Sequence, residues 1–432
     1  MEAESKMHKA KSKYQFDYIN LSKMIMNKRL AVFTLALLQA GLATVKAQET
    51  METGGAKPMP AQWIDSETGH KVIRLVNRES DNGSFYFNNT PFVPQIKNEG
   101  DLMVFYGKTD KGEQLFTVNL KTQKTEQLTN KAKVSGEMVC AKTREAFYQS
   151  GDSIFAVNVN THKTRFIYAF APDFKGRVGT VNADGTYMAC VKATGEQERE
   201  ILAKYPEKHD FFNRIYDAHI QHTLYVLDVK HKTLKQIHQE NEWTNHLLFS
   251  PTDPDNLSYC HEGPWEKVDR IWNINIKTGE NKLLHKRIMV NEIAGHEFFS
   301  PQGNTEWFDL QKPKGQTFFL AGINVKTGKE DRVYQMDRDE WSIHFNVTKD
   351  EQTFAGDGGN SGQVAKAPDG MWIYLFKPDG EHFKSEKLVN MKHHNYHLEP
   401  NVHFSPDEKW VIFRANFEGH EGVYAVEIAK YQ

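Results

Sequence analysis

Residues Ile271–Gly279 read Ile-Trp-Asn-Ile-Asn-Ile-Lys-Thr-Gly, an alternation of apolar and polar side chains that ends in a turn. A period of two is typical of a strand with one buried face, and the Lys-Thr-Gly ending supplies a turn. The phrase has seven copies, spaced mostly by roughly 40–50 residues, which begin at Leu115, Ile154, Leu224, Ile271, Leu320, Trp372 and Gly422. A repeat of this length, with several strands in each unit, predicts an all-β fold, a seven-bladed β-propeller.

A second phrase, Phe-Ser-Pro or a variant of it, precedes several of these strands and marks the end of the first strand of a blade. Its clearest copies begin at Phe249, Phe299, Val347 and Phe404. Three residues before these copies stand His246, His296, His344 and Asn401, and Glu399 lies two residues before Asn401. Because the first strand of each blade lines the central axis, we expect these side chains to converge there. Such a group can build a metal site or a proton-transfer site.

The composition is that of an ordinary soluble protein, with 39% hydrophobic and 25% charged residues in 432. The formal net charge of −2 argues against a nucleic-acid-binding protein, which would carry a basic excess. The three cysteines, Cys140, Cys190 and Cys260, indicate no disulfide framework and no thiolate zinc site. We expect them to serve as small buried apolar side chains.

The N-terminal part resembles a secretion signal. Met-Asn-Lys-Arg at residues 26–29 is followed by an apolar run from Leu30 to Val45 and by a small-residue cleavage site before Gln48. This pattern predicts an N-terminal extension and signal peptide over residues 1–47 and one propeller domain over residues 48–432. The protein is then exported, with the periplasm as its expected location and no membrane span in the mature chain. An N-terminal membrane anchor is the alternative interpretation.

Two further segments stand out. The wider gap between the second and third copies of the strand phrase holds residues 194–222, and we expect an insertion with some helical character that overhangs one mouth of the propeller. The glycine-rich run from Gly356 to Gly362 lacks the Lys-Ser/Thr ending of a phosphate-binding loop and is interpreted as a connection within the propeller. The chain also lacks a Gly-x-Ser-x-Gly motif, which disfavours a serine hydrolase.

Several motifs together resemble one known family. They are Cys260-His-Glu-Gly-Pro264, Asp269-Arg270 followed by an apolar residue and Trp272, His296-Glu-Phe, Asp65-x-x-Thr68-Gly69 and Gly356-Asp-Gly. In a seven-repeat chain, this combination resembles the oligogalacturonate lyases over nearly all of the predicted mature chain. The resemblance implies a seven-bladed propeller that cleaves short uronides by β-elimination and releases an unsaturated product.

The resemblance also implies roles for individual residues. The catalytic base falls on His296, the substrate-binding and catalytic arginine on Arg270, and one metal ligand on His344. The family continues with a glutamine and then His-Pro-His in the last blade, where this chain has Tyr396 and Glu399-Pro400-Asn401. We therefore expect His344, Glu399 and Asn401 to hold a divalent metal, manganese or, with more oxygen ligands, calcium. His246 and His261 are expected to contact the substrate.

These observations predict an oligogalacturonate lyase whose partner is a short galacturonide or a related acidic oligosaccharide. Two alternatives stay open. The altered last blade could serve a lyase for another uronide, such as rhamnogalacturonan fragments, or the chain could be a propeller that binds glycans without cleaving them.

Overall fold

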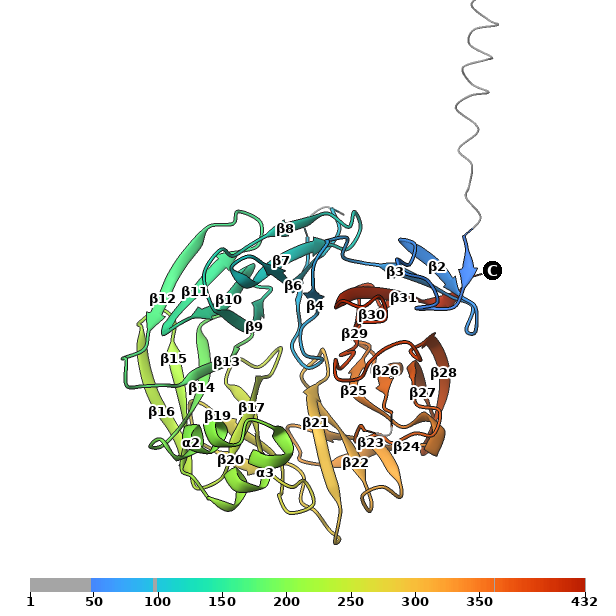
Figure 1. Ribbon diagram of the computed structural model, residues 1–432. Coiled ribbons are helices and arrows are strands. Elements are labelled where there is room, and N and C mark those ends of the chain that lie inside the picture. Colours follow the sequence, from blue (N-terminus) through green and yellow to red (C-terminus); the bar gives the residue numbers. More distant parts are fainter. Residues whose placement is uncertain (1–47, 96–98, 361, 432) are drawn as a thin grey trace, which may run out of the picture. The chain divides into compact units, whose positions relative to one another are not determined.

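The computed structural model describes residues 48–95, 99–360 and 362–431. The predicted extension and signal peptide, residues 1–47, lie outside these described residues. Residues Glu49–Gln432 form one compact unit, in which sheets follow one another around a central axis (Figure 1). Among the described residues, no helix combines the length and the apolar character that crossing a membrane requires.

In the part of the chain that the structure describes, the strands form seven blades, which confirms the predicted all-β propeller. Blade 1 contains β4 (Asn82–Gly83), β5 (Phe92–Val93), β6 (Leu102–Thr109), β7 (Gly112–Asn119) and β8 (Thr125–Gln127). Blade 2 contains β9 (Val134–Cys140), β10 (Glu145–Ser150), β11 (Ser153–Asn158) and β12 (Thr164–Ala169). Blade 3 contains β13 (Arg177–Val181), β14 (Tyr187–Ala193), β15 (His222–Asp228) and β16 (Thr233–Glu240).

The remaining blades follow the same order. Blade 4 contains β17 (Thr244–Phe249), β18 (Asn256–His261), β19 (Ile271–Asn275) and β20 (Asn281–Leu283). Blade 5 contains β21 (Ile293–Phe299), β22 (Thr305–Gln311), β23 (Phe318–Asn324) and β24 (Glu330–Met336). Blade 6 contains β25 (Ser342–Val347), β26 (Phe354–Gly358), β27 (Trp372–Asp379) and β28 (His382–Asn390), and a short 3-10 helix, Arg338–Glu340, precedes it. Blades 5 and 6 are joined by one parallel residue pair, Gln335 with His382.

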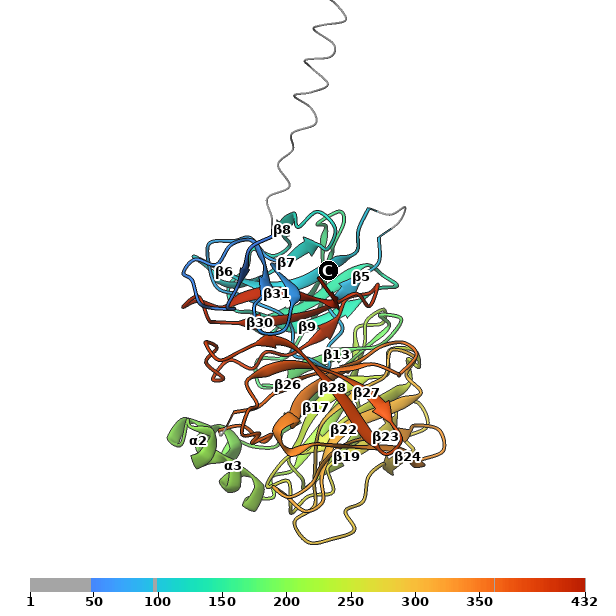
Figure 2. The same ribbon diagram turned by 90° about the vertical axis from the view of Figure 1, so that its right-hand side faces the viewer.

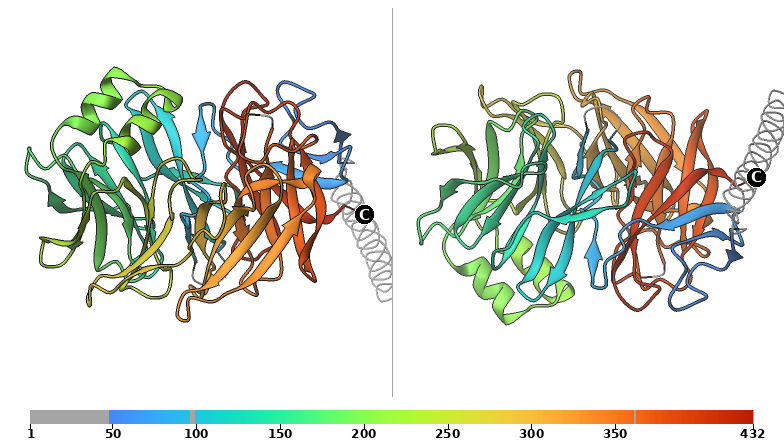
Figure 3. Two further views of the ribbon diagram at one scale, coloured as in Figure 1. Left: turned by 90° about the horizontal axis from the view of Figure 1, so that it is seen from below. Right: turned by 90° about the horizontal axis from the view of Figure 1, so that it is seen from above.

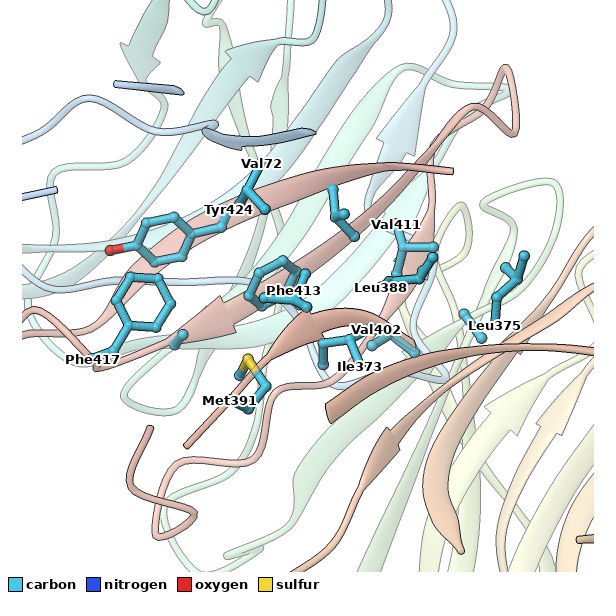
Figure 4. Close-up of a cluster of buried hydrophobic side chains, with 14 of the residues drawn as sticks. Val72, Ile373, Leu375, Leu388, Met391, Val402, Val411, Phe413, Phe417 and Tyr424 are labelled. Carbon is cyan, nitrogen blue, oxygen red and sulfur yellow. The ribbon is translucent and has the colours of Figure 1, made fainter. Parts of the chain in front are cut away.

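Blade 7 closes the ring by combining the two ends of the described chain. Its strands β29 (His403–Phe404), β30 (Trp410–Ala415) and β31 (Gly422–Lys430) are completed by β3 (His70–Arg74), β2 (Gln62–Asp65) and β1 (Thr50–Met51). Antiparallel pairing of β3 with β31 joins them, and Val72, Val411, Phe413 and Tyr424 pack together there in a buried apolar cluster (Figure 4). Closure leaves few exposed sheet edges.

The first strands of blades 4, 5 and 6 each carry a β-bulge at the same place in the repeat. The residues at the bulges are His246, His296 and His344, with φ angles of 49°, 52° and 49°. Asn401, which occupies this place before β29 of blade 7, has a φ of 51°. A left-handed backbone costs a residue other than glycine roughly 1–2 kcal/mol. A bulge changes the direction of its side chain, and the shared positive φ therefore gives all four polar side chains the same direction relative to their blades.

A segment between β4 and β5 of blade 1 passes through the centre of the ring. The backbone N–H of Tyr86 donates to Glu137 of blade 2 at 2.7 Å, and that of Phe87 donates to Asn401 of blade 7 at 3.1 Å. His403 Nε2 lies 3.0 Å from the carbonyl oxygen of Phe85. Three consecutive residues are thereby anchored to blades on different sides, so the segment is fixed in place.

Below this segment lies a cavity of about 400 Å³ at the ends of the first strands. Its wall includes Phe87 together with Phe249, Phe299 and Phe404 of the Phe-Ser-Pro phrases. The side chains of His246, His296 and His344 do not line this cavity. Phe87, whose ring centroid lies 6.2 Å from that of His296 and 5.2 Å from that of His344, therefore separates the cavity from the histidines.

The predicted insertion forms two helices, α2 (Gln197–Lys204) and α3 (Lys208–Asp217), which confirms its helical character. Both helices lie on one face of the propeller (Figures 2 and 3). Phe212 of α3 packs edge-on against Trp243, with ring centroids 5.3 Å apart. Tyr216 approaches Gly263 so closely that a Cβ there would lie 2.5 Å from its ring, so the glycine is required for this contact. The helices thus rest on the loops of blade 4.

All three cysteines are buried and free, in agreement with the role expected for them as apolar side chains. The glycine-rich run begins within β26 as Gly356-Asp-Gly358 and continues into the connection to β27. A Cβ on Gly358 would lie 2.1 Å from the carbonyl oxygen of Gly370, so close packing of two backbones explains this glycine.

A buried carboxyl group between blades 4 and 5 gives a testable pH dependence. Glu306 of β22 is 0% exposed and accepts a hydrogen bond from Ser258 of β18, while Oε2 has no partner among the described residues. Burial, with the nearby Glu297 charge, raises the pKa of Glu306 from 4.5 to about 8. The folded protein therefore holds this proton more tightly than the unfolded chain does. Its stabilising effect is complete below the unfolded pKa and is lost as the pH rises through the folded pKa.

Glu306→Gln, which mimics the protonated carboxyl, should therefore flatten the loss of stability with rising pH. The slope assigned to this one group is about 1.4 kcal/mol for each pH unit in that window. Urea unfolding at about pH 5 and about pH 8.5 measures the free energy of unfolding at both ends of this window. The variant should be more stable than the wild-type protein only at the higher pH. An unchanged slope in the variant would contradict the assignment.

Candidate active site

His296 of β21 is oriented by a buried carboxylate on the neighbouring strand. Its Nδ1 lies 2.6 Å from Oδ1 of Asp309, whose side chain is completely buried. An acidic partner at Nδ1 holds the proton on that nitrogen and leaves Nε2 of the neutral ring as a proton acceptor. The ring is 11% exposed and stands edge-on to Trp265, with centroids 5.1 Å apart. This arrangement suits a general base.

His344 of β25 repeats the arrangement one blade later. Its Nδ1 lies 3.0 Å from Oδ2 of Asp357, and its ring centroid is 4.7 Å from that of His296. Both aspartates follow their histidine by 13 residues, on the second strand of the blade. The sequence reasoning missed Asp309 and Asp357, although this equal spacing was a signal that could have revealed them.

The other ring nitrogen of His344 faces a second carboxylate. Nε2 is buried without a hydrogen-bond partner in the described part of the chain, and it lies 3.6 Å from Oε2 of Glu399. Two lone pairs that face one another require a proton or a cation between them. His344 and Glu399 therefore fit a divalent cation, with the carboxylate behind Nδ1 that ligating histidines commonly have.

Asn401, the third predicted ligand, uses its amide for the backbone. Oδ1 accepts from the N–H of Phe87 at 3.1 Å, and Nδ2 donates to the carbonyl oxygen of Glu399 at 3.0 Å. Its own N–H donates to Asp357 at 3.0 Å. Asn401 thus links Phe87 of the central segment to Asp357, the carboxylate that orients His344. If Asn401 also bound a metal through Oδ1, that oxygen would have to accept from Phe87 at the same time. Tyr396, at the position of the family's glutamine, is buried, and its hydroxyl lacks a partner among the described residues.

Local charges shift the pKa values of the two facing groups in opposite directions. Burial disfavours the charged form of His344, but Asp357 and Glu399 outweigh it and raise the pKa of the imidazole. Burial also opposes ionisation of Glu399, but His344, His296 and more distant cations, Lys208 of α3 among them, lower the pKa of its carboxyl group.

The guanidinium of Arg270, which we expect to bind the substrate, is already bound by two carboxylates of the protein. The residue is 2% exposed, and its guanidinium donates to Glu262 at 2.8 Å through Nη1 and to Glu297 at 3.1 Å through Nε. Although burial alone would favour loss of its proton, the surrounding acidic groups hold the pKa of Arg270 well above its usual value. The structure thus places Arg270 beside the histidines but between two carboxylates, and sequence reasoning had not identified either partner.

His246 lies at the edge of the same charge network. Its Nε2 is 3.3 Å from Oε2 of Glu262, and its ring centroid is 6.1 Å from that of Tyr86. Potential ligand atoms of His246, Cys260 and Glu262 all lie within 4.8 Å of one another. Burial raises the pKa of the Cys260 thiol well above its usual value, and Glu262 is already paired with Arg270. This group is therefore better suited to an ion pair than to a metal.

His261 is not brought to these side chains. Its Nε2 lies 2.9 Å from Glu240 of blade 3, and its ring packs at 4.8 Å from Trp272. Because successive residues of a strand face opposite sides, His261 points away from the face of Cys260 and Glu262. The structure thus places His261 against Glu240 and Trp272, and its role as a substrate contact stays a prediction.

The central segment supplies two residues that the sequence reasoning did not identify. Phe87 forms the base under His296 and His344, as described above, and the ring of Tyr86 lies 5.5 Å from that of His344. The segment precedes the first recognisable repeat, so the repeat pattern could not place it on the axis. Two histidines with oriented acceptor atoms, a facing carboxylate and the Arg270 ion-pair network therefore gather around the bulges of the first strands.

Comparison with known proteins gives a consistent result. The curated relatives include the oligogalacturonate lyase of Dickeya dadantii (strain 3937), which is 26% identical over 390 residues, 85% of this chain and 95% of the relative. The oligogalacturonide lyase of Pectobacterium atrosepticum is 24% identical with the same coverage.

Solved structures of similar fold include an oligogalacturonate lyase in complex with manganese, with 22% identity and a TM-score of 0.72. An oligogalacturonate lyase from Vibrio parahaemolyticus has 23% identity and the same TM-score, and for both structures the match covers 85% of this chain and 96% of the other. A sequence model of the family described as oligogalacturonate lyase matches residues 59–431. Since this match spans nearly the whole propeller, the chain belongs to the oligogalacturonate lyase family.

Proposed function

We propose that the protein cleaves short oligogalacturonides by β-elimination, with His296 as the base. The observation that carries this proposal is the pair of carboxylate-oriented histidines, His296 and His344, which lie side by side and do not line the 400 Å³ cavity. Family membership supports the reaction class and an acidic oligosaccharide as the substrate.

The hard step is removal of the proton at C5 of a galacturonate residue, because the adjacent carboxylate opposes the negative charge that develops. Nε2 of His296 accepts this proton, and the Asp309 carboxylate at Nδ1 stabilises the imidazolium that forms. The C5–H bond breaks, a C4–C5 double bond forms, and the bond between C4 and the glycosidic oxygen breaks. The products are an unsaturated uronide and a saccharide with a free hydroxyl group.

The substrate carboxylate must be neutralised for this step. We propose a divalent cation held by His344 and Glu399, with Asn401 as the third predicted ligand; manganese is supported by the relative solved in complex with that ion, and calcium is the alternative. When bound, the cation acts as a Lewis acid toward the substrate carboxylate. His246 and His261 remain proposed substrate contacts, although only His246 lies near the other histidines.

Arg270 is the second proposed partner of the substrate carboxylate. A fork of donors can bind a carboxylate at two points, but here the donors already face Glu262 and Glu297. Its contribution is therefore twofold: it balances two buried carboxylates, and it places a permanent positive charge beside the reaction centre.

We also propose that the protein is exported to the periplasm. The charged, apolar and small-residue order of residues 26–48 supports this location. N-terminal sequencing of the protein recovered from cell fractions tests it, and a cytoplasmic protein that retains residues 1–47 would contradict the proposal.

His296→Ala should lower kcat for digalacturonate by about 10²–10⁴-fold, since general-base catalysis contributes that much to the rate. The assay is the ultraviolet absorbance of the conjugated product. His231→Ala is the matched control because this histidine is exposed on blade 3 and should leave the rate unchanged. If the His296 variant retains the rate of the wild-type protein, His296 is not the base.

Glu399→Gln should weaken cation binding, because it removes the charged oxygen that faces Nε2 of His344. Titration calorimetry with manganese and with calcium measures the loss, and Glu113→Gln on the exposed side of β7 is the control. We expect chelation to lower the rate of the wild-type protein and added cation to restore it. Equal affinity in the Glu399 variant and the wild-type protein would remove this residue as a ligand.

Arg270→Ala should destabilise the fold by about 3–5 kcal/mol, since it leaves Glu262 and Glu297 buried without their counter-charge. Arg270→Lys keeps the charge but loses the fork, so it should retain most of the stability and raise KM. Urea unfolding and steady-state kinetics separate the two contributions. A folded Arg270→Ala protein of wild-type stability would contradict the structural role.

A further inference from the structure

β-Elimination needs an acid as well as a base. In a galacturonate residue, the C5 hydrogen and the C4 oxygen project from opposite faces of the sugar ring. His296 can reach one face only, so it cannot both remove the proton from C5 and protonate the departing oxygen. A second group with a proton to give must lie across the substrate from His296.

Tyr86 is the candidate for this group, because it lies beside the central histidines. Its ring lies between two of the central histidines, with centroids 6.1 Å from His246 and 5.5 Å from His344. The charges that act on its hydroxyl group come from three blades: Glu399, Glu297, Arg270 and Glu262. Tyr86 does not line the 400 Å³ cavity, although Phe87 does, and its ring contacts the histidines instead.

The backbone of Tyr86 is fixed while its hydroxyl group remains available. Glu137 accepts from the N–H of Tyr86, and Asn401 accepts from the N–H of the next residue. Phe85 and Phe87 on either side are buried, whereas Tyr86 keeps partial exposure. Within the described residues, the hydroxyl group has no hydrogen-bond partner, so it can donate to a ligand without giving up a contact.

A phenol holds its proton near neutral pH, since its ordinary pKa is about 10. The departing oxygen of a sugar is a strong base once its bond to C4 has broken, so a phenol that holds its proton firmly in water can still donate to it.

We propose that Tyr86 is the general acid of the elimination, an inference that rests on the proposed lyase function. As the C4–O bond breaks, the Tyr86 hydroxyl group transfers its proton to the departing oxygen. The proton from C5 moves to His296 and is returned through solvent to the tyrosinate, so no proton is gained or lost over the cycle.

Other proton donors nearby are committed elsewhere. Nε2 of His246 lies 3.3 Å from Glu262, and Nε2 of His344 faces Glu399 as a proposed metal ligand, so neither nitrogen is available to protonate the departing oxygen. Both donors of Arg270 that are described above point at carboxylates. Of the groups that surround the Tyr86 ring, the phenol itself is the one with an uncommitted proton.

The test compares two substrates with different leaving groups. Digalacturonate releases a sugar oxygen that needs a proton, whereas a 4-deoxy-4-fluorogalacturonide releases fluoride, which does not. Tyr86→Phe should lower kcat for digalacturonate by about 10²–10³-fold and leave KM nearly unchanged. For the fluoride substrate the same variant should keep a rate close to that of the wild-type protein. His296→Ala should lose both reactions.

Tyr168→Phe is the control, because this tyrosine lies on the outermost strand of blade 2 and packs on Phe170. Wild-type activity of Tyr86→Phe on digalacturonate would overturn the proposal. An equal loss on both substrates would also overturn it, because that pattern indicates a role in binding or structure. If the wild-type protein itself converts neither substrate with any cation, the lyase function fails first, and the role of Tyr86 falls with it.

Discussion

The β-bulge in the first strands of blades 4 to 6 is the constraint on which the rest of the site depends. It places His246, His296 and His344 in a left-handed backbone that these side chains would not adopt alone, and the strand pairing on either side stabilises it. Because the bulge recurs at one place in the repeat, blades 4, 5 and 6 each present one histidine at the same height. The fold thus fixes where these side chains lie, whereas the sequence determines which residue type stands at each position.

The second organising feature is that each cationic or basic group has its own carboxylate. Asp309 orients His296, Asp357 orients His344, and Glu262 and Glu297 enclose Arg270. Buried charges are tolerated only when they are paired, so these carboxylates stabilise the fold and tune the site at once. They also limit Arg270, whose donors are already engaged before any substrate arrives.

Sequence reasoning was strongest where the repeat is visible. The strand phrase gave the number of blades, and the Phe-Ser-Pro phrase gave the common position of the three histidines and Asn401. It failed where a contact joins residues without a shared phrase. Tyr86 and Phe87 precede the first recognisable copy, and the pairing of Arg270 with Glu297 crosses from one blade to the next. The contact of His261 with Glu240 depends on which face of β18 it occupies, and composition and motif do not reveal that.

The closure of blade 7 has a consequence for how the chain folds. Val72 pairs with Val426, so blade 7 is complete only when strands from both ends of the propeller meet. Joining segments that far apart carries a large loop-closure entropy and makes the final step slow. Until that step, the propeller is an open ring in which β3 and β31 present unpaired strand edges to other chains, so closure also removes a site of aggregation.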